Sequence, residues 1–161
     1  KEKETHGEHR VAQTTQGIWL MIWIVDASVA VRWYLEEEAH YGADEVLRRI
    51  VEEPRRFTVP ELFAFEVYAV LQRLHPNGLL AFRKGVIPLL QGGMLRHPMT
   101  DGLAVKANRF VKKGLTGYDA CYAALALDLK GCWLTYDKKA HQLIEMEGVS
   151  WLLSEGLPEN W

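Results

Sequence analysis

The segment IWIVDAS, residues 22–28, decides the fold class of this chain. It is a short apolar run, rich in β-branched side chains, that ends at Asp26. Such a run is typical of a strand buried on both faces, as in a parallel sheet. We expect a helix to follow directly, capped by Ser28 and running to about Leu35. The segment therefore predicts a strand and a helix with an acidic residue between them.

The remainder of the chain repeats this alternation. Further strands are predicted at 57–59, 132–135 and 149–153. Helices are predicted at 40–53, 61–75, 79–91, 101–113, 117–130 and 137–147. Strands that alternate with helices indicate an α/β domain with a mostly parallel central sheet.

Length and composition favour one ordinary globular domain. The chain has 161 residues, of which 48% are hydrophobic and 25% charged, and its net charge is −2. These values suit a single packed domain, predicted at residues 21–161, and argue against a polycation that binds nucleic acid through bulk charge. Residues 1–20 are mostly polar, so we expect a disordered or non-native N-terminal extension.

The sequence predicts a cytoplasmic protein without a membrane segment. No apolar run approaches the ~20 residues of a membrane span, and the first residues lack the apolar core of a signal peptide. The two cysteines, Cys121 and Cys132, form no CxxC motif and lie in predicted regular elements. We expect them to be buried free thiols in a reducing compartment.

Four acidic residues stand out because each lies beside an apolar stretch. Asp26 ends the first strand, Glu66 lies in ELFAFEVYAVL (61–71), Asp119 lies in TGYDACYAALAL (116–127), and Asp137 lies in WLTYDKKA (133–140). A carboxylate beside a core is costly unless it is paired, hydrogen-bonded or bound to a cation. Because the carboxyl ends of parallel strands share one edge of a sheet, we expect the four acids to converge there.

Each acid also has a purely structural interpretation. Asp26 can begin the turn into the helix, and Asp137 can cap the helix that follows it. Asp119 has the spacing of a capping box. Glu66 lies on an apolar helix face, where Arg73 or a backbone donor would satisfy it. The conjunction of the four, rather than any one of them, favours a shared functional site.

Carboxylates in such a cluster repel one another without cations and suit hard divalent metals, which prefer oxygen ligands. With Mg²⁺ or Mn²⁺, such a cluster can activate water for hydrolysis of a phosphodiester bond. The histidines show no zinc-binding spacing, and neither GxxxxGK[ST] nor GxGxxG occurs. Zinc, nucleotide-triphosphate and dinucleotide sites therefore lack their usual motifs.

Four segments together resemble the PIN-domain ribonucleases, specifically the VapC-type toxins of prokaryotic toxin–antitoxin pairs. The segments are IVDASVAVRWYLEE (24–37), VPELFAFEVYAVLQRL (59–74), LTGYDACYAALALDLKG (115–131) and WLTYDKKA (133–140). The resemblance covers about residues 21–153, with matching order and spacing. It implies a three-layer α/β/α PIN-like domain with a mostly parallel central sheet.

The resemblance also implies roles for particular residues. Three acids would form the metal-binding triad and the fourth would complete the acidic pocket: Asp26, Glu66 and Asp119, then Asp137. Ser28 and Thr135 fall where the family places small hydroxyl side chains that support the acids. Ala69 stands where many relatives have Asn, which removes a potential hydrogen bond but leaves the acidic set intact.

The implied activity is that of a Mg²⁺- or Mn²⁺-dependent endoribonuclease that restrains translation. The implied partners are RNA, a second copy of the chain, and a cognate VapB-type antitoxin, in a heterotetramer or larger complex. Two alternatives stay open. One is a non-catalytic α/β module that binds RNA. The other is a haloacid-dehalogenase-type phosphatase, although that chemistry requires a second Asp where this chain has Ser28.

Overall fold

The computed structural model describes residues 20–161; the predicted extension at 1–20 lies outside this range except for its last residue. Five strands form one all-parallel sheet in the order β3-β2-β1-β4-β5. The strands are β1 (Trp23–Val25), β2 (Phe57–Pro60), β3 (Leu95–His97), β4 (Cys132–Thr135) and β5 (Ser150–Leu152). The prediction of an α/β fold with a parallel sheet is confirmed.

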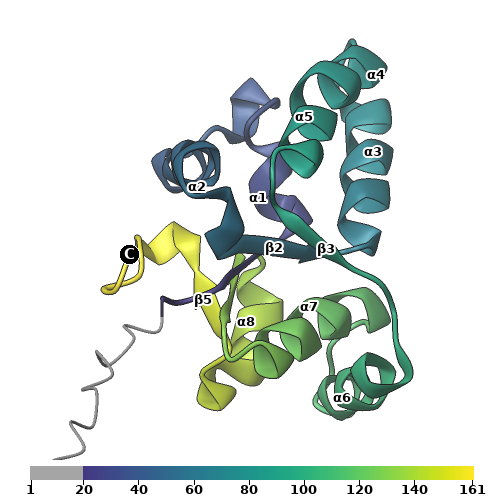
Figure 1. Cartoon of the computed structure of the whole chain (residues 1–161), viewed down its shortest axis with the longest axis vertical. Coiled ribbons are helices and arrows are strands. Elements are labelled where there is room, and N and C mark those ends of the chain that lie inside the picture. The colour runs from purple at the N-terminus through teal and green to yellow at the C-terminus, as the bar shows by residue number, and fades with distance from the viewer. Residues whose placement is uncertain (1–19) are drawn as a thin grey trace, which may run out of the picture.

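Helices cover both faces of the sheet and give three layers (Figure 1). One layer contains α1 (Ala27–Val31), α2 (Tyr41–Glu52), α3 (Leu62–Leu74), α4 (Gly78–Ala81) and α5 (Ile87–Gln91). The other contains α6 (Asp101–Val111), α7 (Gly117–Asp128) and α8 (Lys138–Ile144). Short 3₁₀ turns lie at Glu36–Glu38, Pro54–Arg56, Glu145–Glu147 and Leu153–Glu155. From residue 20 to residue 161, no helix has both the length and the apolar character that a membrane span requires.

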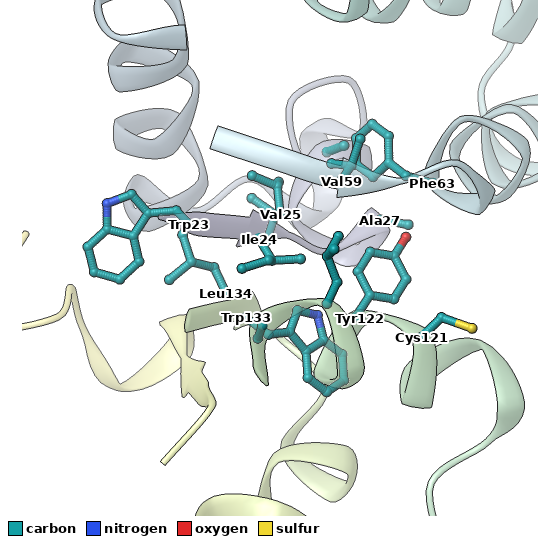
Figure 2. Packing of buried hydrophobic residues seen from close by; sticks show 14 of the residues in the cluster. Trp23, Ile24, Val25, Ala27, Val59, Phe63, Cys121, Tyr122, Trp133 and Leu134 are labelled. Atoms are coloured by element: carbon teal, nitrogen blue, oxygen red, sulfur yellow. The ribbon is translucent and has the colours of Figure 1, made fainter. Parts of the chain in front are cut away.

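The central strand β1 is buried along its whole length. It pairs with β2 on one side and β4 on the other, so that Trp23 lies opposite both Phe57 and Cys132. Side chains alternate between the two faces of a strand, and here both faces are covered by helices. This explains why the strand is a continuous apolar run, and Figure 2 shows its side chains within the core.

Helix α7 lies between the sheet and α6, and most of its side chains are buried. Several of these side chains are alanines, which allow the helix axis to approach the sheet closely. The buried set is Ala120, Cys121, Tyr122, Ala123, Ala124, Leu125 and Ala126. Of the two cysteines, Cys121 is buried and Cys132 is partly buried, and both are free thiols.

The segment MLRHPM (94–99), which lies between the helices predicted at 79–91 and 101–113, contains the edge strand β3. The Thr58 hydroxyl donates a hydrogen bond to the Leu95 carbonyl at 2.8 Å, and the Glu61 amide donates to the His97 carbonyl at 2.8 Å. The side chain of Leu95 is exposed, and Arg96 follows it. An edge strand of this kind has no apolar pattern, so its pairing with β2 alone defines it.

The helix predicted at 79–91 is interrupted. Helices α4 and α5 flank a π-helical turn at Phe82–Val86. Pro88 lies in the first turn of α5 and has no amide hydrogen to donate to the preceding turn. A wider turn before it accommodates this missing hydrogen bond.

The contact between β1 and the start of β4 gives a test of the sheet. An added Cβ at Gly131 would lie 2.4 Å from the Ile22 carbonyl oxygen and 2.8 Å from Ile24 Cδ1. The same carbonyl accepts a hydrogen bond from the Cys132 amide at 2.9 Å, so the strands cannot separate there without loss of pairing. We expect Gly131→Ala to lower the free energy of unfolding by about 2 kcal/mol, measured by urea denaturation.

The matched control is Gly102→Ala in α6, where an added Cβ meets no atom within 4 Å. Alanine favours helix over glycine, so this variant should be as stable as the wild type or slightly more stable. Equal stability of the two variants would contradict the close approach at Gly131.

Candidate active site

The four predicted acids surround the carboxyl ends of β1 and β4. Asp26 directly follows β1, and Asp137 lies two residues after the end of β4. The chain leaves β1 toward β2 and β3 on one side, whereas β4 and β5 lie on the other. This is the point of an open parallel sheet where ligands usually bind. Glu66 and Asp119 reach it from α3 and α7, which belong to opposite helical layers.

Asp26 is buried, with 7% of its surface exposed, and its carboxylate accepts three hydrogen bonds. Oδ2 accepts from the Ser28 amide at 3.0 Å and from the Thr135 hydroxyl at 3.3 Å, and Oδ1 accepts from Trp133 Nε1 at 3.1 Å. Asp26 is thus the cap of α1, and the expected capping by Ser28 is wrong. The Ser28 hydroxyl instead accepts from the Tyr136 amide at 3.1 Å. It thereby ties the chain after β1 to the chain after β4.

Burial raises the pKa of Asp26 to about 6 from an ordinary value of 3.8. The hydrogen bonds from Ser28 and Trp133 lower this pKa in part, and the charge of Asp119 raises it further. Three donors therefore hold the carboxylate in place without fully offsetting the cost of desolvating it.

Glu66 lies on a half-buried face of α3, and the Tyr122 hydroxyl donates a hydrogen bond to its Oε1 at 2.8 Å. The expected partner, Arg73 or a backbone donor, is not the one found. Burial raises the pKa of Glu66 to about 7, Tyr122 partly offsets this effect, and the charges of Asp26 and Asp119 add to it. The pKa of the Tyr122 phenol is also raised, mainly by burial, so it remains a protonated donor.

Asp119 and Asp137 are placed by helix capping, as their spacing predicted. The Asp119 amide donates to the Thr116 hydroxyl, which caps α7, at 3.1 Å. Asp137 Oδ1 accepts from the Ala140 amide at 2.9 Å and caps α8. Burial raises the pKa of Asp119, and the charge of Asp137 raises it further. These positions at the starts of α7 and α8 do not exclude a functional role.

In the part of the chain that the structure describes, no lysine or arginine forms an ion pair with this acidic edge. Within residues 20–161, none of the recorded ion pairs includes any of the four acids. The charge of Asp119 raises the pKa of both Asp26 and Glu66, and the charge of Asp137 raises the pKa of Asp119, as expected for carboxylates that face one site. Among residues 20–161, the site therefore carries negative charge that no ion pair offsets.

The donor set fits a hard divalent cation. In the described part of the chain, no group of three or more His, Cys, Asp or Glu side chains is close enough to hold one ion. Mg²⁺, however, commonly binds through only one or two carboxylates and completes its shell with water and substrate oxygens. The side chains that could hold Mg²⁺ or Mn²⁺ are the carboxylates of Asp26, Glu66, Asp119 and Asp137.

Two residues of the site were not predicted from the sequence. Trp133 and Tyr122 donate hydrogen bonds to Asp26 and Glu66, respectively. Both lie in apolar runs, where an aromatic residue is normally assigned to the core. The only available signal is that each aromatic side chain carries a polar hydrogen that needs an acceptor when it is buried.

Comparison with known proteins identifies the family. A sequence model of the PIN domain matches residues 23–145, a range that contains all four acids. The chain belongs to the PIN domain family. The family expected from the four acidic segments is thereby confirmed. No curated protein sequence matches this PIN domain.

Solved structures of low sequence identity share the fold. FitAcB from Neisseria gonorrhoeae matches with a TM-score of 0.64 at 14% identity, covering 84% of this chain and 100% of its own. VapC20 of Mycobacterium tuberculosis, described as a toxin that cleaves the sarcin–ricin loop, matches with a TM-score of 0.56 at 16% identity. The match covers 74% of this chain and 93% of VapC20. PAE2754 from Pyrobaculum aerophilum matches with a TM-score of 0.55 at 20% identity. The match covers 76% of this chain and 86% of PAE2754. At these identities, the similarity shows the fold.

The raised pKa of Glu66 predicts that this acid destabilises the metal-free protein at high pH. The pKa is about 7 in the folded state against an ordinary 4.5, so ionisation costs the folded state more than the unfolded state. The cost is absent below pH ~4.5, grows as the pH rises and is complete above pH ~7. Glu66→Gln keeps an acceptor for Tyr122 and removes the charge. We expect it to be more stable than the wild type at pH 8 in EDTA, by on the order of 1 kcal/mol after solvent screening, and equally stable at pH 4.

Urea denaturation at the two pH values measures this difference. Glu155→Gln, which changes an exposed carboxylate outside the site, is the control and should match the wild type at both. A Glu66→Gln variant less stable than the wild type at pH 8 would contradict the assigned electrostatics.

Proposed function

We propose that this PIN domain is a divalent-metal-dependent endoribonuclease of the VapC toxin type. The observation that carries the proposal is the set of four carboxylates at the switch point of the sheet: neighbouring acids raise the pKa of Asp26, Glu66 and Asp119, and none of the four forms an ion pair within the described residues. Such uncompensated charge is costly, and a bound cation would relieve it. The fold shared with VapC20, described as a toxin that cleaves the sarcin–ricin loop, agrees with this chemistry.

The four acids would have different roles because they differ in burial and in hydrogen bonding. Asp26 is buried and accepts three hydrogen bonds, so its carboxylate would hold a cation in a fixed position. Asp137 is exposed and Asp119 is partly exposed, so this side of the site is accessible to a substrate phosphate. When bound, Mg²⁺ or Mn²⁺ would lower the pKa of a coordinated water and stabilise negative charge on the phosphate. Without a cation, the carboxylates would repel the RNA backbone.

Of the two alternatives, the phosphatase has lost its support. The chain belongs to the PIN family, and it lacks the second Asp that the phosphatase chemistry requires. At that position Ser28 instead accepts a hydrogen bond from the Tyr136 amide. A non-catalytic module that binds RNA has the same fold. It differs from a nuclease in needing neither metal nor intact acids to bind.

We infer two protein partners, one from the exposed apolar side chains and one from the charge of the acidic edge. Large apolar side chains are exposed along α3 and α4, including Phe65, Tyr68, Leu79 and Leu80, and a second copy of the chain would cover them. A cognate VapB-type antitoxin would supply Arg or Lys to the acidic edge in place of a cation. A peptide from the protein encoded beside this one tests the inhibition by an antitoxin, and undiminished cleavage at saturating peptide would contradict it.

The molar mass in solution tests the dimer, and the mass of a single chain would contradict it.

Cleavage of RNA is the direct test of the proposed activity. Total RNA incubated with the protein and Mg²⁺ or Mn²⁺ should yield discrete fragments, and EDTA should abolish them. Asp119→Asn should reduce the cleavage rate at least a hundredfold, because it removes a charge from the site while preserving the shape of the side chain. Fragment mapping on sequencing gels measures both the rate and the site of cleavage.

The control for this substitution is Asp101→Asn, an exposed acid in the first turn of α6 that lies outside the site. It should cleave as the wild type does. RNA binding without any cleavage, unaffected by EDTA and by Asp119→Asn, would favour the non-catalytic module instead.

Metal binding is expected to depend on pH. Asp26 has a pKa of about 6 and Glu66 a pKa of about 7 without metal, so protons compete with the cation below pH 7. At a Mn²⁺ concentration 100 times the dissociation constant at pH 8, the free energy of unfolding should rise by about 2.7 kcal/mol. The same concentration at pH 5 should give a much smaller increase. Thermal unfolding with and without Mn²⁺ measures both, and an equal increase at the two pH values would argue against binding by these acids.

A further inference from the structure

Tyr122 and Trp133 form a stacked aromatic pair directly beneath the acidic site. Their ring centroids lie 5.8 Å apart with an interplanar angle of 15°, and both side chains are fully buried. Tyr122 comes from α7 and Trp133 from β4. Figure 2 shows the two rings side by side, with the Tyr122 oxygen directed toward Ala27 at the start of α1.

Each ring of the pair donates one hydrogen bond, and the two bonds go to different acids. Trp133 Nε1 donates to Asp26 Oδ1 at 3.1 Å, and the Tyr122 hydroxyl donates to Glu66 Oε1 at 2.8 Å. Asp26 follows the central strand, whereas Glu66 belongs to α3 in the layer opposite Tyr122. The pair therefore connects the sheet and both helical layers at the site.

We propose that the Tyr122–Trp133 pair is a positioning device that fixes the relative orientation of the Asp26 and Glu66 carboxylates for cation binding. The inference rests on the proposed function. A carboxylate that accepts a directed hydrogen bond at one oxygen loses freedom to rotate and keeps its other lone pairs in defined directions. Because the two donors sit on stacked, close-packed rings, neither ring can shift without displacing the other.

Trp23 shows that this arrangement is not required simply to bury an indole. Its side chain is as buried as that of Trp133, yet its Nε1 has no hydrogen-bond partner among the described residues. It packs instead against Trp161 at the opposite end of β1, with ring centroids 5.3 Å apart. Trp23 therefore supplies a matched control, because Trp→Phe there changes core packing but removes no donor from the acidic site.

Mn²⁺ affinity is the measurement that separates positioning from packing. Electron paramagnetic resonance of free Mn²⁺ gives the dissociation constant for the wild type, Trp133→Phe, Tyr122→Phe, the double variant and Trp23→Phe. Trp133→Phe and Tyr122→Phe each keep an aromatic ring and remove one donor, so each should weaken binding about tenfold. The double variant should weaken it by clearly less than a hundredfold, because the two donors act through one stacked unit. Trp23→Phe should bind within twofold of the wild type, whatever stability it loses.

Two further readouts report on the acidic site rather than on core packing. The indole N–H signal of Trp133 in a ¹⁵N–¹H NMR spectrum should shift when Mg²⁺ is added, because its acceptor is one of the binding carboxylates, whereas that of Trp23 should not. RNA cleavage by Trp133→Phe should be restored largely by raising Mn²⁺, since a weakened site can still be filled.

The outcomes distinguish this inference from the proposed function. Wild-type Mn²⁺ affinity in Trp133→Phe and Tyr122→Phe would overturn the positioning role and leave the nuclease proposal in place. A full hundredfold loss in the double variant would overturn the coupling through the stack. A folded wild-type protein that binds no Mn²⁺ would overturn the proposed function, and the positioning role with it.

Discussion

Burial of the Asp26 carboxylate at the end of the central strand is the constraint on which the rest of the site depends. A charge at this position is costly, and the raised pKa of the group records that cost. The fold limits it with three donors that come from α1, from the last residue of β4 and from the Trp133 indole. Strand β4 must lie beside β1 for two of these donors to reach the carboxylate. The pairing of the sheet and the geometry of the acid are therefore a single requirement.

The two helical layers complete this arrangement from opposite sides. Helix α7 approaches the sheet closely because its buried face is built largely of alanine, and this approach carries Tyr122 to Glu66 on α3. The hydrogen bond between them joins side chains from the two opposite helical layers. A bulkier α7 would move its phenol away from Glu66. Small uncharged side chains on α7 thus help to determine the geometry of the site.

The electrostatics show a conflict between stability and chemistry. A protein selected only for stability would place a lysine or an arginine near four interacting carboxylates, or would replace some of them with neutral side chains. In the described residues, basic side chains instead pair with acids elsewhere, as on α2, where Arg48 pairs with Glu45 and Glu52. Destabilised polar clusters of this kind are typical of functional sites, where binding of a cation or a substrate supplies the missing interaction.

The sequence by itself determined the α/β class, the apolar strands β1, β2, β4 and β5, and the placement of the four acids beside apolar segments, because these depend on local periodicity and residue type. It also predicted the capping positions of Asp119 and Asp137, which are set by neighbours within four residues. Tertiary structure decided the edge strand β3, whose exposed residues carry no period, and the partners of the buried acids. Tyr122 lies 56 residues from Glu66, and Trp133 lies 107 residues from Asp26. Contacts at such separations depend on the order of the strands and on how closely a helix packs against them, and no local pattern in the chain records either.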